Sequence, residues 1–217
     1  MNFKTIFKSL KNHDMLRRIL IVLGLLIVYR FLAHIPVPLG EPTTFQEAVQ
    51  NLITNSDFGG FLNLISGGGL TSFSILLVGI SPYITAQIVV QLVTKAIPRL
   101  EELSEDGEAG RRKINQWTRI LTIPLAIVQS IAYIFILYQS VIASNTALAY
   151  TPTTADWLLS VTAMVAGSVM LMWFGELMTE QGIGNGISLI IFTSIISQLP
   201  STVANLGTAL FDTSAGS

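Results

Sequence analysis

The sequence predicts an all-α, polytopic membrane protein, and three observations support this fold class. Hydrophobic residues make up 51% of the 217-residue chain and charged residues only 12%, whereas about a quarter of an ordinary soluble domain is charged. Residues 58–94 and 181–211 contain no charged residue, and a membrane-spanning helix needs only about 20 apolar residues. Apart from Arg30, all Lys and Arg lie in two clusters, one before Ile19 and one between Lys95 and Arg119. The positive-inside rule places both clusters in the cytoplasm.

The N-terminal region predicts a surface helix that leads into the first span. Residues 1–18 combine basic and apolar side chains at helical spacing, which indicates a cytoplasmic amphipathic helix on the membrane surface. We expect the first span at residues 19–35, ended on the outer side by Pro36 and Pro38. The segment from Ile19 lacks the small-residue site that signal-peptide cleavage requires, so we expect it to be retained.

The charge-free run at residues 58–94 is too long for one ordinary span and too short for two spans with a turn. Both basic clusters are expected in the cytoplasm, so an even number of crossings separates them, and the first span already supplies one. We therefore expect residues 57–69 to form a short re-entrant half-helix and residues 70–97 to form the second span. Re-entrant backbone is tolerated only where it is buried in protein or lines a cavity. Pro82 should kink the second span near its middle.

The remaining elements follow from the alternation of charged and apolar stretches. We expect a cytoplasmic loop at residues 98–119, a third span at 120–141, a fourth at 156–174 and a fifth at 187–211. The motif GIGNG at residues 182–186 predicts a tight cytoplasmic turn, because glycines permit positive φ angles. Five spans place the N-terminus in the cytoplasm and the C-terminus of this chain outside. This arrangement is typical of one half of an inverted-repeat architecture.

The sequence offers little for catalysis or for binding a metal or cofactor. It has no cysteine and two histidines, which stand in the N-terminal tail and an external turn without the pattern of a catalytic triad. The second to fifth predicted spans carry no ionisable group at mid-depth, where ion-coupled transporters usually keep one. These features favour a passive pore, sealed by apolar side chains, over an enzyme or a pump. One repeat of a secondary transporter and a non-conducting subunit that pairs with other membrane proteins remain as alternatives.

Several motifs, spread over essentially the whole chain, resemble the SecY family of protein-translocation channels. They are FGG at residues 58–60, SGGGL at 66–70, GISPYITA at 79–86, GEAGRRKI at 107–114, WFGE at 173–176 and GIGNGIS at 182–188. The resemblance implies ten spans in two inverted halves around an hourglass pore, of which this chain supplies the first five. It further implies a bacterial inner-membrane channel, without enzymatic activity, that passes unfolded secretory chains across and releases transmembrane segments into the bilayer.

The resemblance also assigns roles to individual residues. A pore ring falls on Ile80, Ile84, Ile191 and Ile195; each pair has i, i+4 spacing, so its members share a helix face, and β-branched side chains are stiff. A plug falls on residues 57–69, and its named members are Phe58, Phe61, Leu62, Leu64, Ile65, Gly67 and Gly68. A lateral gate is implied at Thr85 and Gln129. The basic residues Arg111, Arg112, Lys113 and Arg119 either contact a cytoplasmic partner or anchor the topology at anionic lipid.

The partners that the resemblance implies are other parts of the Sec system. SecE and SecG would accompany the chain in the bilayer, and SecA or a translating ribosome would supply the driving force from the cytoplasm. Signal peptides and nascent chains would be the substrates. Contact with nucleic acid is expected only with ribosomal RNA, by way of the ribosome.

Overall fold

The computed structural model describes residues 13–37, 74–143 and 153–212, without the side chains at 137, 140–143, 201–202 and 204–212. Within these residues the chain forms six helices and no strand, apart from an isolated bridge between Pro36 and Ser74. The predicted all-α class is confirmed for this part of the chain. The predicted plug at residues 57–69, with all its named members, lies outside the described residues, as do residues 1–12 of the predicted surface helix.

Helix α2 spans His13–Leu32 and therefore begins before the predicted first span. It ends ahead of Pro36, as the sequence indicated. The amide of Ala33 donates to the carbonyl oxygen of Tyr29 at 3.0 Å, and the His34 ring nitrogen Nδ1 is 2.8 Å from the Arg30 carbonyl oxygen. These hydrogen bonds satisfy carbonyl groups that a helix C-terminus otherwise leaves without partners.

Helix α5 spans Ser81–Ala96, whereas the second span was predicted at residues 70–97. The prediction that Pro82 kinks the middle of this span is wrong, because Pro82 lies in the first turn of α5. In the first turn no intrahelical bond is lost, and the fixed φ of proline suits a helix start. The preceding residues 74–80 are not helical, and Gly79 has a φ of 61°.

Helices α6 (Pro98–Glu105) and α7 (Gly107–Ala143) occupy the region where a loop was predicted at residues 98–119. The chain turns at Gly107, which has a φ of 76° and so adopts a conformation that glycine favours. The 37 residues of α7 make a helix about 55 Å long, at 1.5 Å per residue. This length exceeds the hydrocarbon thickness of a membrane, about 30 Å. The predicted third span is therefore only the second part of α7.

Helices α8 (Thr154–Glu180) and α9 (Gly186–Asp212) contain the predicted fourth and fifth spans. A capping box starts α8, because the Thr153 hydroxyl accepts from the Asp156 amide and the Asp156 carboxylate accepts from the Thr153 amide. By length and apolar composition, two stretches among the described residues qualify as membrane spans, Gly107–Ile136 and Thr154–Glu180. The full set of five spans stays a prediction.

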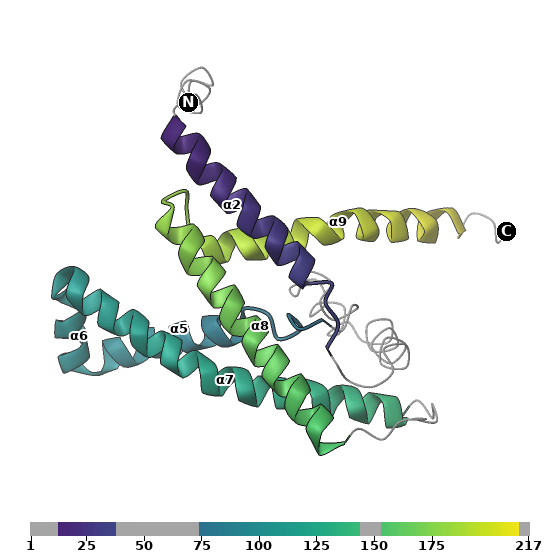
Figure 1. The fold of residues 1–217 in the computed structure, drawn as a ribbon, viewed down its shortest axis with the longest axis horizontal. Helices are drawn as coiled ribbons and strands as arrows, with labels where there is room; N and C mark the ends of the chain where they lie inside the picture. The colour runs from purple at the N-terminus through teal and green to yellow at the C-terminus, as the bar shows by residue number, and fades with distance from the viewer. Residues whose placement is uncertain (1–12, 38–73, 144–152, 213–217) are drawn as a thin grey trace.

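Helix α8 holds the described part together, since α2, α5, α7 and α9 all pack against it. Figure 1 shows α2 and α9 crossing near its C-terminal half, while α9 then continues away from the other helices. One apolar cluster joins α2, α5, α8 and α9. Within it, the hydroxyl groups of Tyr29 on α2 and Ser194 on α9 form a buried hydrogen bond of 2.5 Å. A buried polar pair of this kind fixes how the two helices cross.

Candidate functional site

The predicted ring residues Ile80 and Ile84 lie at the start of α5. Ile80 is the N-cap residue of the helix, and the Ile84 amide donates to its carbonyl oxygen at 3.1 Å. The two side chains therefore share one face of the helix, as the i, i+4 spacing indicated. Ile80 is buried in the apolar cluster, and Ile84 is partly buried against it.

The other two predicted ring residues, Ile191 and Ile195, lie in the first half of α9. Ile191 is partly buried against the same apolar cluster as Ile80 and Ile84. Ile195, one turn farther along α9, is 43% exposed and does not belong to the cluster. The structure therefore brings three of the four isoleucines to one cluster and leaves Ile195 outside it.

The structure does not pair the two predicted gate residues with each other. The Thr85 hydroxyl donates to the Ser81 carbonyl oxygen of its own helix at 3.0 Å. Gln129 lies on α7, where its side-chain oxygen Oε1 is buried and has no hydrogen-bond partner among the described residues. A buried amide oxygen without a partner is uncommon in proteins, so Gln129 is the more unusual of the two positions.

The four predicted basic contact residues fall into two environments. Arg111, Arg112 and Lys113 are exposed near the start of α7, where Arg112 forms a long ion pair of 3.9 Å with Glu108. Arg119, about two turns later, donates to the Glu176 carboxylate of α8 at 2.7 Å. The Glu176 side chain is only 17% exposed. Arg119 therefore joins two helices, a role that sequence spacing did not reveal.

The Arg119–Glu176 pair borders a polar cleft of about 320 Å³ between α5, α7, α8 and the start of α9. Its other polar lining includes Tyr83, Gln87, Asn115, Thr179, Glu180 and Asn185. Hydroxyl, amide and carboxylate groups from α5, α7, α8 and the corner before α9 thus line one hollow. The cleft lies beside the start of α5, because Tyr83 and Gln87 stand within two turns of Ile80. Such a lining accommodates water or a polar chain rather than lipid.

The GIGNG motif forms the corner between α8 and α9. Gly182 has a φ of 72°, which confirms the prediction that a glycine there permits a positive φ. The Thr179 hydroxyl accepts from the Gly186 amide at 2.9 Å and donates to the Gly175 carbonyl oxygen at 2.7 Å. A Cβ atom on Gly186 would overlap the Gly175 carbonyl oxygen. The corner is therefore closed by backbone contacts that larger residues would break.

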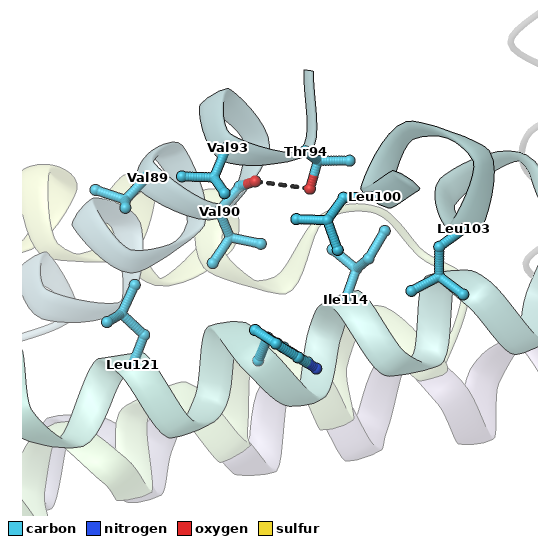
Figure 2. Close-up of a pocket in the computed structure, with 9 residues that line it drawn as sticks. Val89, Val90, Val93, Thr94, Leu100, Leu103, Ile114 and Leu121 are labelled. Carbon is cyan, nitrogen blue, oxygen red and sulfur yellow. Dashed lines mark hydrogen bonds between the residues drawn. The ribbon is translucent and has the colours of Figure 1, made fainter. Parts of the chain in front are cut away.

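A second hollow, about 140 Å³ in volume, is apolar and lies between α5, α6 and α7. Figure 2 shows Val90 and Leu121 on one side of it and Leu100 and Leu103 of α6 on the other. The hydroxyl of Thr94, a lining residue, donates to the Val90 carbonyl oxygen at 2.7 Å, as the dashed line in Figure 2 marks. Its lining offers no group for chemistry, so this hollow serves the packing of α6 onto α7.

Comparison with known proteins gives one consistent result. The SecY family profile matches residues 74–215. The protein translocase subunit SecY of Streptomyces coelicolor is 39% identical over 200 residues, which cover 90% of this chain and 46% of the relative. The subunit of the same name from Buchnera aphidicola subsp. Acyrthosiphon kondoi is 42% identical over 201 residues, which cover 92% of this chain and 55% of the relative. The chain thus spans about half the length of the curated relatives it matches. Since the profile covers well over half of it, the chain belongs to the SecY family.

Proposed function

We propose that this chain forms one half of a protein-conducting channel in the bacterial inner membrane. The relatives that it matches are named protein translocase subunit SecY, and the chain corresponds to about half of their length. In this proposal the pore is passive, the N-terminus is cytoplasmic and the five predicted spans surround one side of the conduit. SecE and SecG accompany it, and SecA or a ribosome delivers the signal peptide and the unfolded chain.

The observation that carries the proposal is the meeting of Ile80, Ile84 and Ile191 at one apolar cluster. These residues come from α5 and α9, which are far apart in the sequence and both pack on α8. A constriction that excludes ions needs stiff apolar side chains supplied by more than one helix. Ile195, one turn after Ile191 on α9 and 43% exposed, is the ring residue left free to face the conduit in this proposal.

The polar cleft next to the proposed ring supports a path for the translocating chain that begins on the cytoplasmic side. Its hydroxyl and amide groups come from α5, α7, α8 and the corner before α9, and the same lining includes the ends of helices predicted to be cytoplasmic. We propose that an unfolded chain passes through this cleft before it reaches the isoleucines. The plug at residues 57–69 and the lateral gate at Thr85 and Gln129 complete the proposal. The exposed positions of Arg111, Arg112 and Lys113 support a cytoplasmic contact there more than at Arg119.

Site-specific cross-linking in the complete channel complex tests the proposal. The chain has no cysteine, so a single introduced thiol is its only one. A translocating chain arrested midway, with one cysteine in its arrested segment, should form a disulfide with Ile84→Cys and with Ile191→Cys. Val89→Cys and Ile196→Cys are matched controls, because five residues along a helix point to a different face and both positions are exposed. Equal cross-linking at ring and control positions would refute the assignment of the ring.

A further inference from the structure

The residues that precede α5 form a buried, non-helical segment, Ser74–Ile80, which we name the anchor segment. Ser74, Leu76, Leu77 and Val78 are each 3% exposed or less. Non-helical backbone at membrane depth is stable only when other parts of the protein satisfy its polar groups. The contacts of the anchor segment therefore decide whether it is fixed or free.

On one side, the anchor segment is hydrogen-bonded to the residues that follow α2. The Ile75 amide donates to the Ile35 carbonyl oxygen at 3.0 Å, and Ser74 pairs with Pro36 in an antiparallel bridge. The segment also closes on itself, since the Leu77 amide donates to the Ser74 carbonyl oxygen at 2.9 Å. These bonds attach the segment to α2 through the backbone, independently of side-chain identity.

On the other side, the anchor segment lies directly on the backbone of α8 at Gly167. A Cβ atom at Gly167 would overlap the Ile75 carbonyl oxygen, and it would lie 3.0 Å from the Ile75 carbonyl carbon and 3.1 Å from Leu76 Cδ2. A glycine inside a helix costs about 1 kcal/mol relative to alanine, so a specific packing reason is expected for it. The carbonyl group of Ile75 supplies that reason.

The anchor segment ends at Ile80, the first of the proposed ring residues. Gly79, with its φ of 61°, turns the chain from the segment into α5. The position of Ile80 is thus fixed by α2 and α8 together, not by α5 alone. Between Ile75 and Ile80 stand three buried residues, Leu76, Leu77 and Val78, so a shift of the Ile75 backbone would be passed on to Ile80.

We infer that the anchor segment stays fixed on α2 and α8 when the channel conducts, and that Gly167 is a positioning residue for Ile80. The inference rests on the proposed channel function. The anchor segment then behaves as part of the rigid frame that α8 organises.

The first test is Gly167→Ala in the complete channel complex, reconstituted in planar bilayers. The added methyl group must displace the Ile75 carbonyl group, and with it Ile80, so ion conductance of the idle channel should rise several-fold. Gly24→Ala is the matched control, because no atom lies within 4 Å of a Cβ atom at this glycine of α2. Idle conductance that is unchanged in Gly167→Ala and in Gly24→Ala alike would overturn the positioning role.

The second test asks whether the anchor segment moves, and it does not depend on how well Gly167→Ala folds. Residues in an antiparallel bridge have Cα atoms about 4.5–5.5 Å apart, a separation that a disulfide can span. The double variant Pro36→Cys/Ser74→Cys should form this disulfide and translocate a secretory chain at the same rate before and after reduction. Translocation that is blocked in the oxidised form and restored by reductant would overturn the inference.

The two ideas fail in different ways. If the ring cysteines cross-link to the arrested chain but the disulfide blocks transport, the channel function stands and the fixed anchor does not. If Ile84→Cys and Ile191→Cys cross-link no better than their controls, the proposed ring fails first.

Discussion

The ion pair between Arg119 and Glu176 should contribute more to stability than the other ion pairs among the described residues. Its atoms lie 2.7 Å apart, and Glu176 is 17% exposed while Arg119 is 48% exposed. A hydrogen bond to a charged group contributes about 1.5–3 kcal/mol when buried, and solvent screening at the half-exposed guanidinium reduces this to about 1 kcal/mol. In a domain of this size, about 1 kcal/mol corresponds to a change of about 2–4 °C in Tm.

A double-mutant cycle measures this coupling directly. We expect Arg119→Gln and Glu176→Gln each to lower the Tm of the purified protein in detergent, and the double variant to lose little more than the worse single variant. Arg119→Gln should be the more harmful, because it leaves the less exposed carboxylate without its partner. The exchanged pair Arg119→Glu/Glu176→Arg should recover part of the loss, since a cation near the C-terminus of α8 is favoured by the helix dipole.

The pair between Lys95 and Glu101 is the internal control. Its atoms are 3.1 Å apart, but the two side chains are 75% and 42% exposed. Exposed pairs of this kind typically contribute about 0.2–1 kcal/mol, and salt screens them. If the coupling energy of Arg119 and Glu176 is no larger than that of Lys95 and Glu101, the reasoning from burial and distance is refuted.

Two further predictions concern the contacts that connect the helices. Ser194→Ala should lower the Tm by a few degrees, because the buried Tyr29 hydroxyl loses its partner at a cost of about 1–3 kcal/mol. Adding Tyr29→Phe should restore part of the lost stability, and thermal unfolding followed by tryptophan fluorescence measures the Tm of both variants. Gly182→Ala should also destabilise the protein in the same assay, since the left-handed backbone conformation costs residues other than glycine about 1–2 kcal/mol. Gly24→Ala is the control and should be neutral or slightly stabilising, because no atom lies within 4 Å of a Cβ atom at this position of α2.

The helices themselves could largely be predicted from the sequence, because charge and apolarity alternate so clearly along it. The start of α5 was missed for a local reason. The charge-free run suggested one continuous span, although a proline directly after serine at Ser81 is a recognised helix-start signal. The position of Gly79 two residues earlier pointed the same way. Apolarity alone does not distinguish a buried irregular segment from a helix.

Contacts between distant helices could not be predicted from spacing. Glu176 stands 57 residues after Arg119, and no local pattern connects the two. The same holds for Gly167, whose partner is a backbone carbonyl group and so leaves no trace in side-chain chemistry. The i, i+4 spacing of Ile80 and Ile84 did predict their shared face, but their meeting with Ile191 at one cluster depends on how α5 and α9 pack on α8.

The region from the end of α5 to the start of α7 has a consequence for how fast the proposed cytoplasmic partner would find this surface. The basic side chains Lys95, Arg99, Arg111, Arg112 and Lys113 are matched one for one by the acids Glu101, Glu102, Glu105, Asp106 and Glu108. Beyond a Debye length of about 8 Å the two sets of charges largely cancel. Electrostatic steering, which accelerates association when a surface has one dominant sign, is therefore weak here. The encounter rate should depend little on ionic strength, and selectivity must arise from close fit after contact rather than from attraction at a distance.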